Sequence, residues 1–384
     1  MTSILLTGGA GYIGSHTAKA LAKAGYQPVV LDNLCAGHRW AVRWGPLVEG
    51  EIANRALVRR TLEEFSIKSV IHFAANASVG ESMSEPYRYL HDNVKGSLEL
   101  LEGMREAGAK HIVVSSTCAT YGAPQKVPLA ETERQAPTNP YGESKLFVER
   151  ALAWYGHIHG VKAVALRYFN AAGADPDGEI GEDHDPESHL IPLVIQAALG
   201  TRPFVQLFGT DYPTPDGSAI RDYIHVDDLA DAHIRSLEHL VKGGSSEALN
   251  LGTGRGHSVR EVIAAVERVS GRPVPVHESA RRAGDPPELV ADASRAQSVL
   301  GWKPRYDTLD AIVRTAWNWH AASRRKERTL FCLPATGRNW LRWRESLSPR
   351  VLPYRCSAAM SLKKTRSGTL CHRLFAIYRP STCW

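Results

Sequence analysis

A tyrosine and a lysine four positions apart are the residues of this sequence best suited to proton transfer. Tyr141 and Lys145 stand at the start of a predicted helix that continues through Phe147, Val148 and Leu152. The helical spacing places the phenol and the ammonium on one face. A phenol has an ordinary pKa of about 10 and is a poor base at neutral pH, but a neighbouring positive charge favours the phenolate. Tyr141 could then remove the proton of a hydroxyl group.

Three hydroxyl side chains precede this pair. Ser115, Ser116 and Thr117 end a predicted strand. Sheets of parallel strands bind their ligands at the carboxyl ends of the strands, where a hydroxyl can orient a substrate oxygen. A Tyr-x-x-x-Lys spacing alone occurs on many helices without function. The combination of the two features therefore predicts a catalytic site.

A glycine-rich turn lies near the start of the chain. Its sequence is Gly8-Gly9-Ala10-Gly11-Tyr12-Ile13-Gly14, between a predicted strand at 4–7 and a predicted helix at 16–24. Glycine allows a tight turn and close approach of the backbone to a ligand. The new helix points its unpaired N–H groups and its positive dipole end at a pyrophosphate. This position favours binding of a dinucleotide.

Asp32 indicates which dinucleotide is bound. It follows the second predicted strand, where a carboxylate can accept hydrogen bonds from both hydroxyls of an adenosine ribose and would repel a 2′-phosphate. Asn33 is expected to share this role. The pair selects NAD over NADP, although Asp-Asn also suits a turn. The positively charged oxidised nicotinamide would further favour the phenolate of Tyr141.

Short apolar runs alternate with helical patterns in the first half of the chain. Buried strands are predicted at 4–7, 28–31, 69–74, 111–115 and 163–168, and helices at 16–24 and 87–107. Parallel neighbours need a crossover helix, so this alternation predicts an α/β fold with a doubly wound parallel sheet. We assign this domain to residues 1–170.

The pattern changes after residue 170. Segments 174–181 and 209–217 are rich in Pro, Gly and Asp and are predicted to be loops over the carboxyl ends of the strands, which makes them candidates for a substrate pocket. A helical pattern follows at 259–269. We expect residues 171–320 to form mainly a smaller, mixed α/β substrate domain, with some return to the first domain.

The composition excludes several classes of protein. The hydrophobic fraction is 43% and the charged fraction 22%, which is ordinary for a globular chain, and no apolar run approaches the ~20 residues that span a bilayer. The opening residues lack the basic start and long apolar core of a signal peptide, so a cytoplasmic location is expected. The six Cys form no Cys-x-x-Cys pair, so neither a zinc nor a redox motif is indicated.

The positive charge of the chain is concentrated at its end. The net charge is +6, but from residue 321 onward fourteen Lys and Arg face two acids, which leaves a net charge of −6 on residues 1–320. An acidic body disfavours a nucleic-acid partner. Residues 321–384 form a basic tail without usable periodicity. We assign it neither a fold nor a chemistry.

Four segments together resemble the UDP-glucose 4-epimerase family of extended short-chain dehydrogenases: 7–16, 115–122, 141–145 and 167–173. The resemblance covers residues 2 to about 320 and implies a Rossmann-like NAD domain and a UDP-sugar substrate. It also implies that Thr117, Tyr141 and Lys145 form the catalytic set. Tyr141 would take the proton of the 4-hydroxyl while NAD accepts the hydride, and the hydride would return to the opposite face of the 4-keto sugar.

The resemblance further implies two sets of binding residues. The cofactor set comprises Gly8, Gly11, Tyr12, Ile13, Gly14, Asp32, Asn33, Glu51, Ile52, Phe73, Ala74, Asn93, Lys145 and Tyr168. The substrate set comprises Thr117, Tyr141, Asn170, Leu190, Arg221, Tyr223, Arg282 and Asp285. The arginine side chains can form paired hydrogen bonds with the phosphates of the substrate, and Asp285 can accept a hydrogen bond from a ribose hydroxyl. An ion pair of Arg221 with Asp222 is the structural alternative.

Three positions depart from the family pattern. Glu51 stands where an aspartate usually contacts adenine, and Ala77 replaces a frequent lysine, so one cofactor hydrogen bond is missing or supplied elsewhere. Leu289 stands where some members carry a tyrosine beside the sugar. The smaller side chain could admit N-acetylated hexoses, or Leu289 could simply pack.

Other activities stay open at this stage. A UDP-N-acetylhexosamine or UDP-pentose 4-epimerase would share the same machinery. A nucleotide-sugar dehydratase is disfavoured, because Cys118-Ala119 stands where dehydratases carry an acidic pair. A binding protein without catalysis is disfavoured by the intact trio.

The remaining expectations concern metals and assembly. His16, His72, His189 and His225 lie on separate predicted elements without ligand spacing, so local packing and no metal are expected. The resemblance suggests a homodimer, with helices at 87–107 and 141–154 in a four-helix contact.

Overall fold

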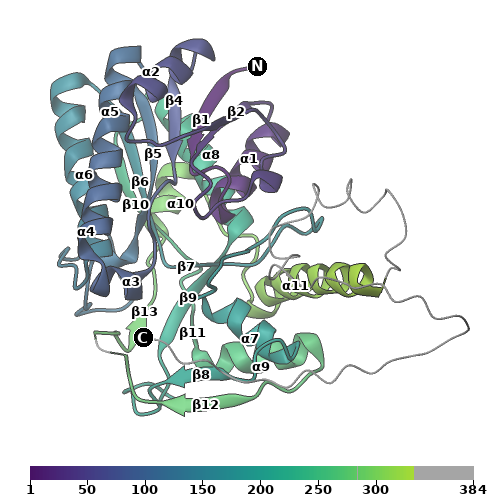
Figure 1. Cartoon of the computed structure of the whole chain (residues 1–384). Helices are drawn as coiled ribbons and strands as arrows, with labels where there is room; N and C mark the ends of the chain where they lie inside the picture. Colours follow the sequence, from purple (N-terminus) through teal and green to yellow (C-terminus); the bar gives the residue numbers. More distant parts are fainter. Residues whose placement is uncertain (283, 333–384) are drawn as a thin grey trace, which may run out of the picture.

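A seven-stranded parallel sheet forms the larger part of the molecule. The structure, a computed structural model, describes residues 1–332 apart from residue 283 (Figure 1). Every neighbouring pair in this sheet is parallel. In spatial order the strands are β10 (Glu247–Leu251), β6 (Lys162–Tyr168), β5 (His111–Thr117), β4 (Ser69–His72), β1 (Ser3–Thr7), β2 (Gln27–Asp32) and β3 (Leu47–Glu49). The expected α/β class with a parallel sheet is confirmed.

Helices cover both faces of this sheet (Figure 1). Alternate side chains of β1 enter different cores: Ile4 and Leu6 pack on one face and Leu5 on the other. The first core is closed by α1 (Tyr12–Lys23), α8 (Val226–Val241) and α10 (Ser294–Leu300). The second is closed by α2 (Arg55–Glu64), α5 (Gly96–Ala107) and α6 (Pro140–His159).

Short helical segments connect these elements. Two are the 3-10 turns Arg39–Ala41 and Cys118–Thr120, and the others form a run before α5 that is interrupted at Glu85. This run consists of α3 (Val79–Ser84), α4 (Pro86–Tyr89) and the π-helical turn Leu90–Lys95. A π-helical turn inside a helix frequently marks a functional position.

A smaller part of the chain lies beyond the carboxyl ends of the large sheet (Figure 1). Its central strand β9 (Ile220–His225) pairs in parallel with β7 (Asn170–Ala172) and β13 (Glu288–Leu289) and antiparallel with β11 (Gly256–Ser258). The second small sheet joins β8 (Val205–Phe208) and β12 (Val276–Ser279). The core of this smaller part of the chain is closed by α7 (Leu190–Ala198), α9 (Val259–Ser270) and α11 (Leu309–Cys332).

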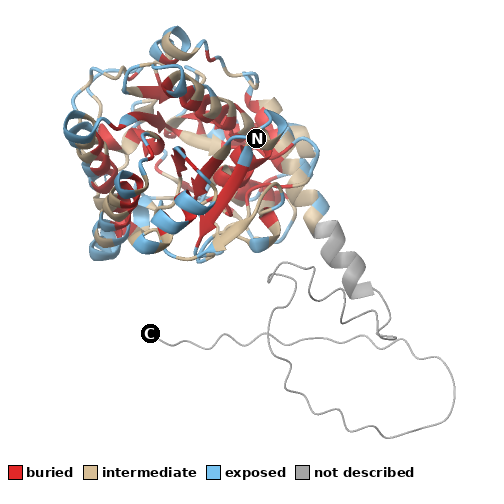
Figure 2. Cartoon of the chain, turned by 90° about the horizontal axis from the view of Figure 1, so that it is seen from above, coloured by how far each residue is buried: buried red, intermediate tan, exposed pale blue. Residues whose placement is uncertain are grey.

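Several segments after residue 170 return to the large sheet. β10 forms its edge beside β6, and α8 covers one face. Buried residues follow the strands through the body of the molecule (Figure 2). Helix α11 runs past residue 320, and residues 333–384 of the basic tail lie outside the described part. Within the described residues no helix is long and apolar enough to cross a membrane.

Candidate active site

Tyr141 and Lys145 lie at the buried start of α6. The helix begins at Pro140, and the side chain of Asn139 accepts a hydrogen bond from Gly142 N at 2.8 Å as its N-terminal cap. Lys145 Nζ donates to the main-chain carbonyl of Ser115 at 2.8 Å. This bond holds α6 against the carboxyl end of β5. The helix therefore presents Tyr141 at the edge where parallel sheets bind ligands.

The protonation of this pair is set mainly by burial. Burial raises the pKa of Tyr141, whereas a hydrogen bond with Thr117 acts in the opposite direction. Burial lowers the pKa of Lys145 to about 8. The expected lowering of the Tyr141 pKa by Lys145 is therefore not what the polypeptide produces. Desolvation of the phenolate outweighs the effects of the neighbouring groups.

Thr117 and Tyr168 complete the immediate surroundings. Thr117 ends β5, and its hydroxyl accepts a hydrogen bond from Ala119 N at 3.1 Å. Tyr168 lies opposite Thr117 at the end of β6, and its hydroxyl is hydrogen-bonded to that of Ser115. Burial raises the pKa of Tyr168 to about 12. Two adjacent strand ends thus place Thr117 and Tyr168 near Tyr141.

A buried charged network supports the end of β5 and was missed from the sequence. Glu149 on α6 forms an ion pair with Arg167 at 2.5 Å and accepts a hydrogen bond from Ser116 at 2.5 Å. Arg167 also donates to the hydroxyl of Tyr121 at 2.9 Å. Glu149 follows Lys145 by one helical turn. The sequence signal for Glu149 was its position one helical turn after Lys145, on a helix face that is largely buried.

The glycine turn between β1 and α1 is closely packed. Gly8 has a φ of +72°, and a Cβ on Gly14 would lie 2.3 Å from Gly8 O. Gly11 caps α1 without any side-chain hydrogen bond. The first N–H groups of the helix are therefore not covered by a capping side chain, and the backbone can approach a ligand closely.

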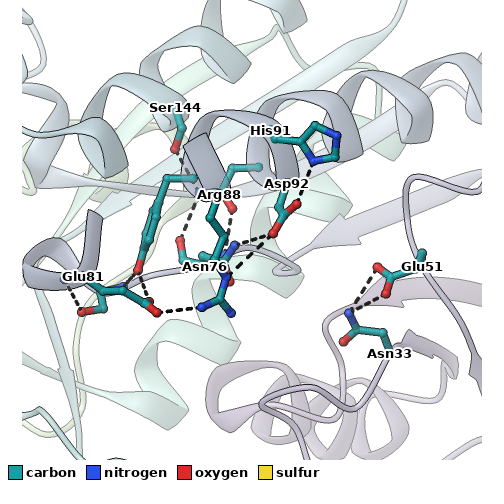
Figure 3. Close-up of polar contacts among 11 residues, drawn as sticks. Asn33, Glu51, Asn76, Glu81, Arg88, His91, Asp92 and Ser144 are labelled. Atoms are coloured by element: carbon teal, nitrogen blue, oxygen red, sulfur yellow. Dashed lines mark hydrogen bonds and ion pairs between the residues drawn. The ribbon is translucent and has the colours of Figure 1, made fainter. Parts of the chain in front are cut away.

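Asp32 ends β2 beside this turn. Its carboxylate accepts hydrogen bonds from Ala10 N at 2.9 Å and Leu34 N at 2.8 Å. Asn33 Nδ2 donates to both carboxylate oxygens of Glu51, at 3.1 and 3.2 Å (Figure 3). The longer Glu51 side chain is thus held beside Asn33. Each carboxylate oxygen of Asp32 keeps a second lone pair for a further donor.

Asn93 links the loop after β4 to the catalytic helix. It lies in the π-helical turn and is buried. Its side chain accepts from Asn76 N at 2.8 Å and donates to Ser144 Oγ at 3.0 Å (Figure 3). Ser144 in turn donates to Tyr141 O at 2.7 Å. A chain of hydrogen bonds therefore runs from the loop to Tyr141.

The other expected cofactor residues surround the same edge of the sheet. Phe73 N and Ala74 N both donate to Thr7 O, at 2.9 and 3.1 Å, which places them beside the glycine turn. The Tyr12 hydroxyl donates to Gly173 O at 2.7 Å. Ile13 and Ile52 are partly buried against the first and second cores.

The expected substrate residues lie mainly on the small sheet. Asn170 on β7 stands opposite Tyr223 on β9. Arg221, two residues before Tyr223, forms an ion pair with Asp285. Asp222 instead accepts hydrogen bonds from Thr253 and from main-chain N–H groups. The alternative ion pair between Arg221 and Asp222 is wrong, because the two side chains of neighbouring strand residues point to opposite faces.

Three further residues border this region. Leu190 is the first residue of α7 and is half-buried. Leu289 pairs with Arg221 along the strands and packs beside Cys118. The guanidinium of Arg282 lies over the ring of Phe208, 4.1 Å from its centre. Arg282 is exposed and makes no ion pair with Asp285 among the described residues.

A family model settles the relationship of the chain. The NAD dependent epimerase/dehydratase family matches residues 4–252. The chain belongs to this family. It is 55% identical to a UDP-glucose 4-epimerase of Rhizobium leguminosarum bv. trifolii over 321 residues, 84% of this chain and 98% of the relative.

Solved structures of this epimerase/dehydratase family agree with the fold. A UDP-glucose 4-epimerase from Brucella ovis in complex with NAD is 52% identical, with a TM-score of 0.81, over 83% of this chain and 98% of that one. A UDP-Glc/GlcNAc 4-epimerase from Campylobacter jejuni is 39% identical, with a TM-score of 0.74, over 84% and 100%. These relationships support NAD-dependent 4-epimerization of a UDP-hexose.

The residues present fit the cofactor of this family. A side chain at Gly14 or Gly8 would fill the cradle, and α1 starts without a capping side chain. Asp32 lies at the end of β2, where a ribose is bound in such folds. Cys118, in the position of the dehydratase acid, is buried, and burial raises the pKa of its thiol to about 12.

Proposed function

We propose that this member of the family inverts carbon 4 of a UDP-hexose, with Tyr141 as the catalytic base and NAD as a bound cofactor. One observation carries the assignment of the residues. Tyr141, hydrogen-bonded to Thr117, stands at the carboxyl end of β5, on a helix that Lys145 fastens to Ser115. The glycine turn and Asp32 lie at the same edge of the sheet.

Proton transfer is the contribution of the polypeptide. Tyr141 would accept the proton of the 4-hydroxyl and return it after the sugar has turned over, and Thr117 would hold the sugar oxygen. When bound, oxidised NAD supplies a hydride acceptor and a positive charge beside the sugar. That charge and the hydrogen bond with Thr117 oppose the effect of burial on the pKa of Tyr141.

Substrate binding is assigned to the small sheet. Arg221 would hold the pyrophosphate and Asp285 the uridine ribose, because a guanidinium pairs with phosphate and a carboxylate accepts from hydroxyls. Asn170, Leu190, Tyr223 and Arg282 would line the same region. This assigns cofactor binding mainly to residues 1–170 and substrate binding mainly to 171–320.

The identity of the sugar is a separate proposal. Leu289 pairs with Arg221 and is only half-buried, so its side chain borders both the hydrophobic cluster at Cys118 and the proposed substrate region. We propose that N-acetylated UDP-hexoses are accepted. A UDP-pentose is the alternative substrate. Dehydration is disfavoured because burial raises the pKa of the Cys118 thiol to about 12, which makes it too weak an acid to protonate a leaving hydroxide.

A homodimer is proposed from the exposed apolar side chains on neighbouring helices. Phe147, Trp154 and Ile158 of α6 are exposed, as are Met83 and Tyr87 on α3 and α4, which pack beside α6. Pairing of these helices between two copies would cover them. A dimer in light scattering, lost in Trp154→Glu, is expected, and a monomeric parent chain would contradict it. A cytoplasmic location stays a prediction.

The epimerase proposal is tested by incubating the purified chain with UDP-galactose without added NAD and following the sugars by NMR. UDP-glucose should form, and Tyr141→Phe should abolish its formation while the protein keeps its bound NAD. If the chain converted a different UDP-sugar but not UDP-galactose, that sugar would replace UDP-galactose as the assigned substrate. Unchanged activity of Tyr141→Phe, or no conversion of any UDP-sugar by an NAD-loaded protein, would contradict the proposed mechanism.

A further inference from the structure

Two glutamates and two histidines converge in the loop between β7 and α7. Nδ1 of His189 lies 2.9 Å from Glu182 Oε1 and 3.0 Å from Glu187 Oε1. Nδ1 of His184 lies 3.3 Å from Glu182 Oε1 and 3.9 Å from Glu187 Oε2. One ligand atom can be chosen from each of the four residues so that the four atoms all lie within 4.8 Å of one another.

These separations match a tetrahedral site. Zinc binds histidine nitrogen and carboxylate oxygen at roughly 2.0–2.2 Å, so the ligand atoms of a tetrahedral ion are about 3.3–3.5 Å apart. The four measured separations, 2.9 to 3.9 Å, lie on both sides of that value. The ligand atoms, which lie within 4.8 Å of one another, would move together by side-chain rotation to enclose an ion.

The carboxylates of this cluster are buried without a cation from a lysine or arginine. The side chains of Glu182 and Glu187 are 4% and 5% exposed. The imidazole nitrogens of His184 and His189 face Glu182 Oε1, at 3.3 and 2.9 Å. Among the side chains that the structure describes, which exclude those of residues 283 and 324–332, no lysine or arginine forms an ion pair with either glutamate. A buried carboxylate normally has a cationic partner or coordinates a metal, and here both glutamates face the ring nitrogens of His184 and His189.

A neighbouring acidic cluster provides the contrast. Asp175, Asp177 and Glu179 also lie close enough to hold an ion. There, however, Lys19 Nζ already occupies the centre, at 2.7, 2.8 and 2.8 Å from the three carboxylates. The same stretch of chain thus contains one acidic cluster neutralised by an ammonium and one that is lined by imidazole nitrogens instead.

We propose that Glu182, His184, Glu187 and His189 bind one divalent transition-metal ion, with Zn²⁺ as the ion that best fits two imidazoles and two carboxylates. Imidazole ligands favour Zn²⁺ over Mg²⁺ and Ca²⁺, which prefer oxygen. Four protein ligands leave no open position, so the site is structural rather than catalytic. The sequence predicted no metal at His189, because His189 was compared with distant histidines and not with His184.

The position of the site indicates what the ion would stabilise. His184 packs edge-on against Tyr12 of the glycine turn, with ring centres 6.2 Å apart. His189 immediately precedes Leu190, at the start of α7. The loop is already fastened to α11 through a hydrogen bond from Trp319 Nε1 to Glu182 O at 3.0 Å. An ion here would tie the cofactor-binding turn and the substrate region to one rigid loop.

Zinc binding to the full untagged chain tests this inference. After treatment with a chelator and gel filtration, the protein should take up about one Zn²⁺ per chain, and its unfolding temperature should rise with zinc concentration. His189→Gln and Glu187→Gln should each lose this zinc and this shift. His157→Gln, which removes an exposed histidine from the end of α6, should keep both.

Two outcomes would overturn the metal site. One is wild-type zinc affinity in a folded His189→Gln protein, with folding checked by circular dichroism. The other is a cobalt-substituted protein whose absorption shows thiolate ligands, because four of the six Cys lie at or beyond residue 332 and could bind the metal instead. Neither measurement uses epimerase activity, so failure of the metal site leaves the proposed function untouched.

Discussion

Arg221 and Asp285, which are 64 positions apart in the sequence, form an ion pair beside the small sheet. The same guanidinium nitrogen donates to Pro286 O at 2.9 Å. β9 carries the arginine, and the carboxylate comes from the segment that leads into β13. The proposed phosphate and ribose contacts of the substrate are therefore adjacent and held in a fixed relation.

Arg221→Lys is expected to weaken substrate binding. A lysine keeps the charge but loses the planar fork that can serve Asp285, Pro286 O and a phosphate together. The loss of one charge-assisted hydrogen bond, about 1.5–3 kcal/mol, should raise KM for the UDP-sugar by about 10- to 100-fold, with a smaller effect on kcat. Steady-state kinetics and inhibition by UDP measure this.

Arg268→Lys is the matched control. Arg268 on α9 also pairs with an aspartate, Asp310, but this pair is exposed and involves none of the proposed site residues. Its KM should match that of the parent chain. An equal change in both variants would show that Arg221 acts through general stability.

Much of the fold was predictable because its signals are local. The apolar runs of β1 and β2 and the glycines between β1 and α1 depend on residues close in sequence, and the structure places them as expected. The small sheet was not predictable in the same way. Its strand β7 has three residues and β13 has two, too few to show an alternating pattern.

The chemistry of the site was less predictable than its residues. The spacing of Tyr141 and Lys145 correctly indicated one helical face, but the pKa of Tyr141 depends on burial by segments far away in the sequence. The partner of Arg221 was likewise decided by the return of residue 285 to β9. Long-range packing, which one sequence does not display, determines both.

Gly14→Ala should prevent NAD from being retained. A Cβ here would lie 2.3 Å from Gly8 O and 2.7 Å from Gly9 Cα, so the turn would have to move. Overpacking of this kind costs roughly 1–3 kcal/mol, which corresponds to an about 5- to 150-fold loss of affinity. NAD released by denaturing the purified protein measures retention. Gly80→Ala is the control, since a Cβ at Gly80 meets nothing within 4 Å.

Asp32→Asn should shift the preference between the two dinucleotides. The substitution removes the charge that repels a 2′-phosphate and weakens the acceptor for the ribose hydroxyls. NAD affinity should fall by about 10- to 100-fold, while the affinity for NADP should fall less. Exposed Asp307→Asn should change neither affinity. Equal losses for both dinucleotides would mean that Asp32 only braces Ala10 and Leu34.

Leu289→Tyr should restrict the range of sugars. If Leu289 leaves space for an N-acetyl group, a bulky ring there should lower kcat/KM for UDP-N-acetylglucosamine by about 10- to 100-fold and leave that for UDP-glucose nearly unchanged. Leu289→Met, which conserves volume, should retain both activities. A parent chain that already rejects UDP-N-acetylglucosamine would show that Leu289 merely packs beside Cys118.

The buried histidines should make the fold sensitive to mild acid. His72 is held between the hydroxyls of Thr7, at 2.7 Å, and Ser97, at 2.9 Å, and burial lowers its pKa to about 3. The unfolded chain takes up a proton on this imidazole as the pH falls below about 6.5, whereas the folded chain does not. The unfolding free energy should therefore fall by about 1.4 kcal/mol per pH unit for this residue, from about pH 6 down to its folded pKa.

Urea unfolding of the NAD-loaded protein between about pH 5 and pH 7 measures the slope. His72→Gln should reduce that slope by about one proton, with exposed His157→Gln as the matched control. Equal slopes in His72→Gln and the parent chain would rule out a neutral, buried His72.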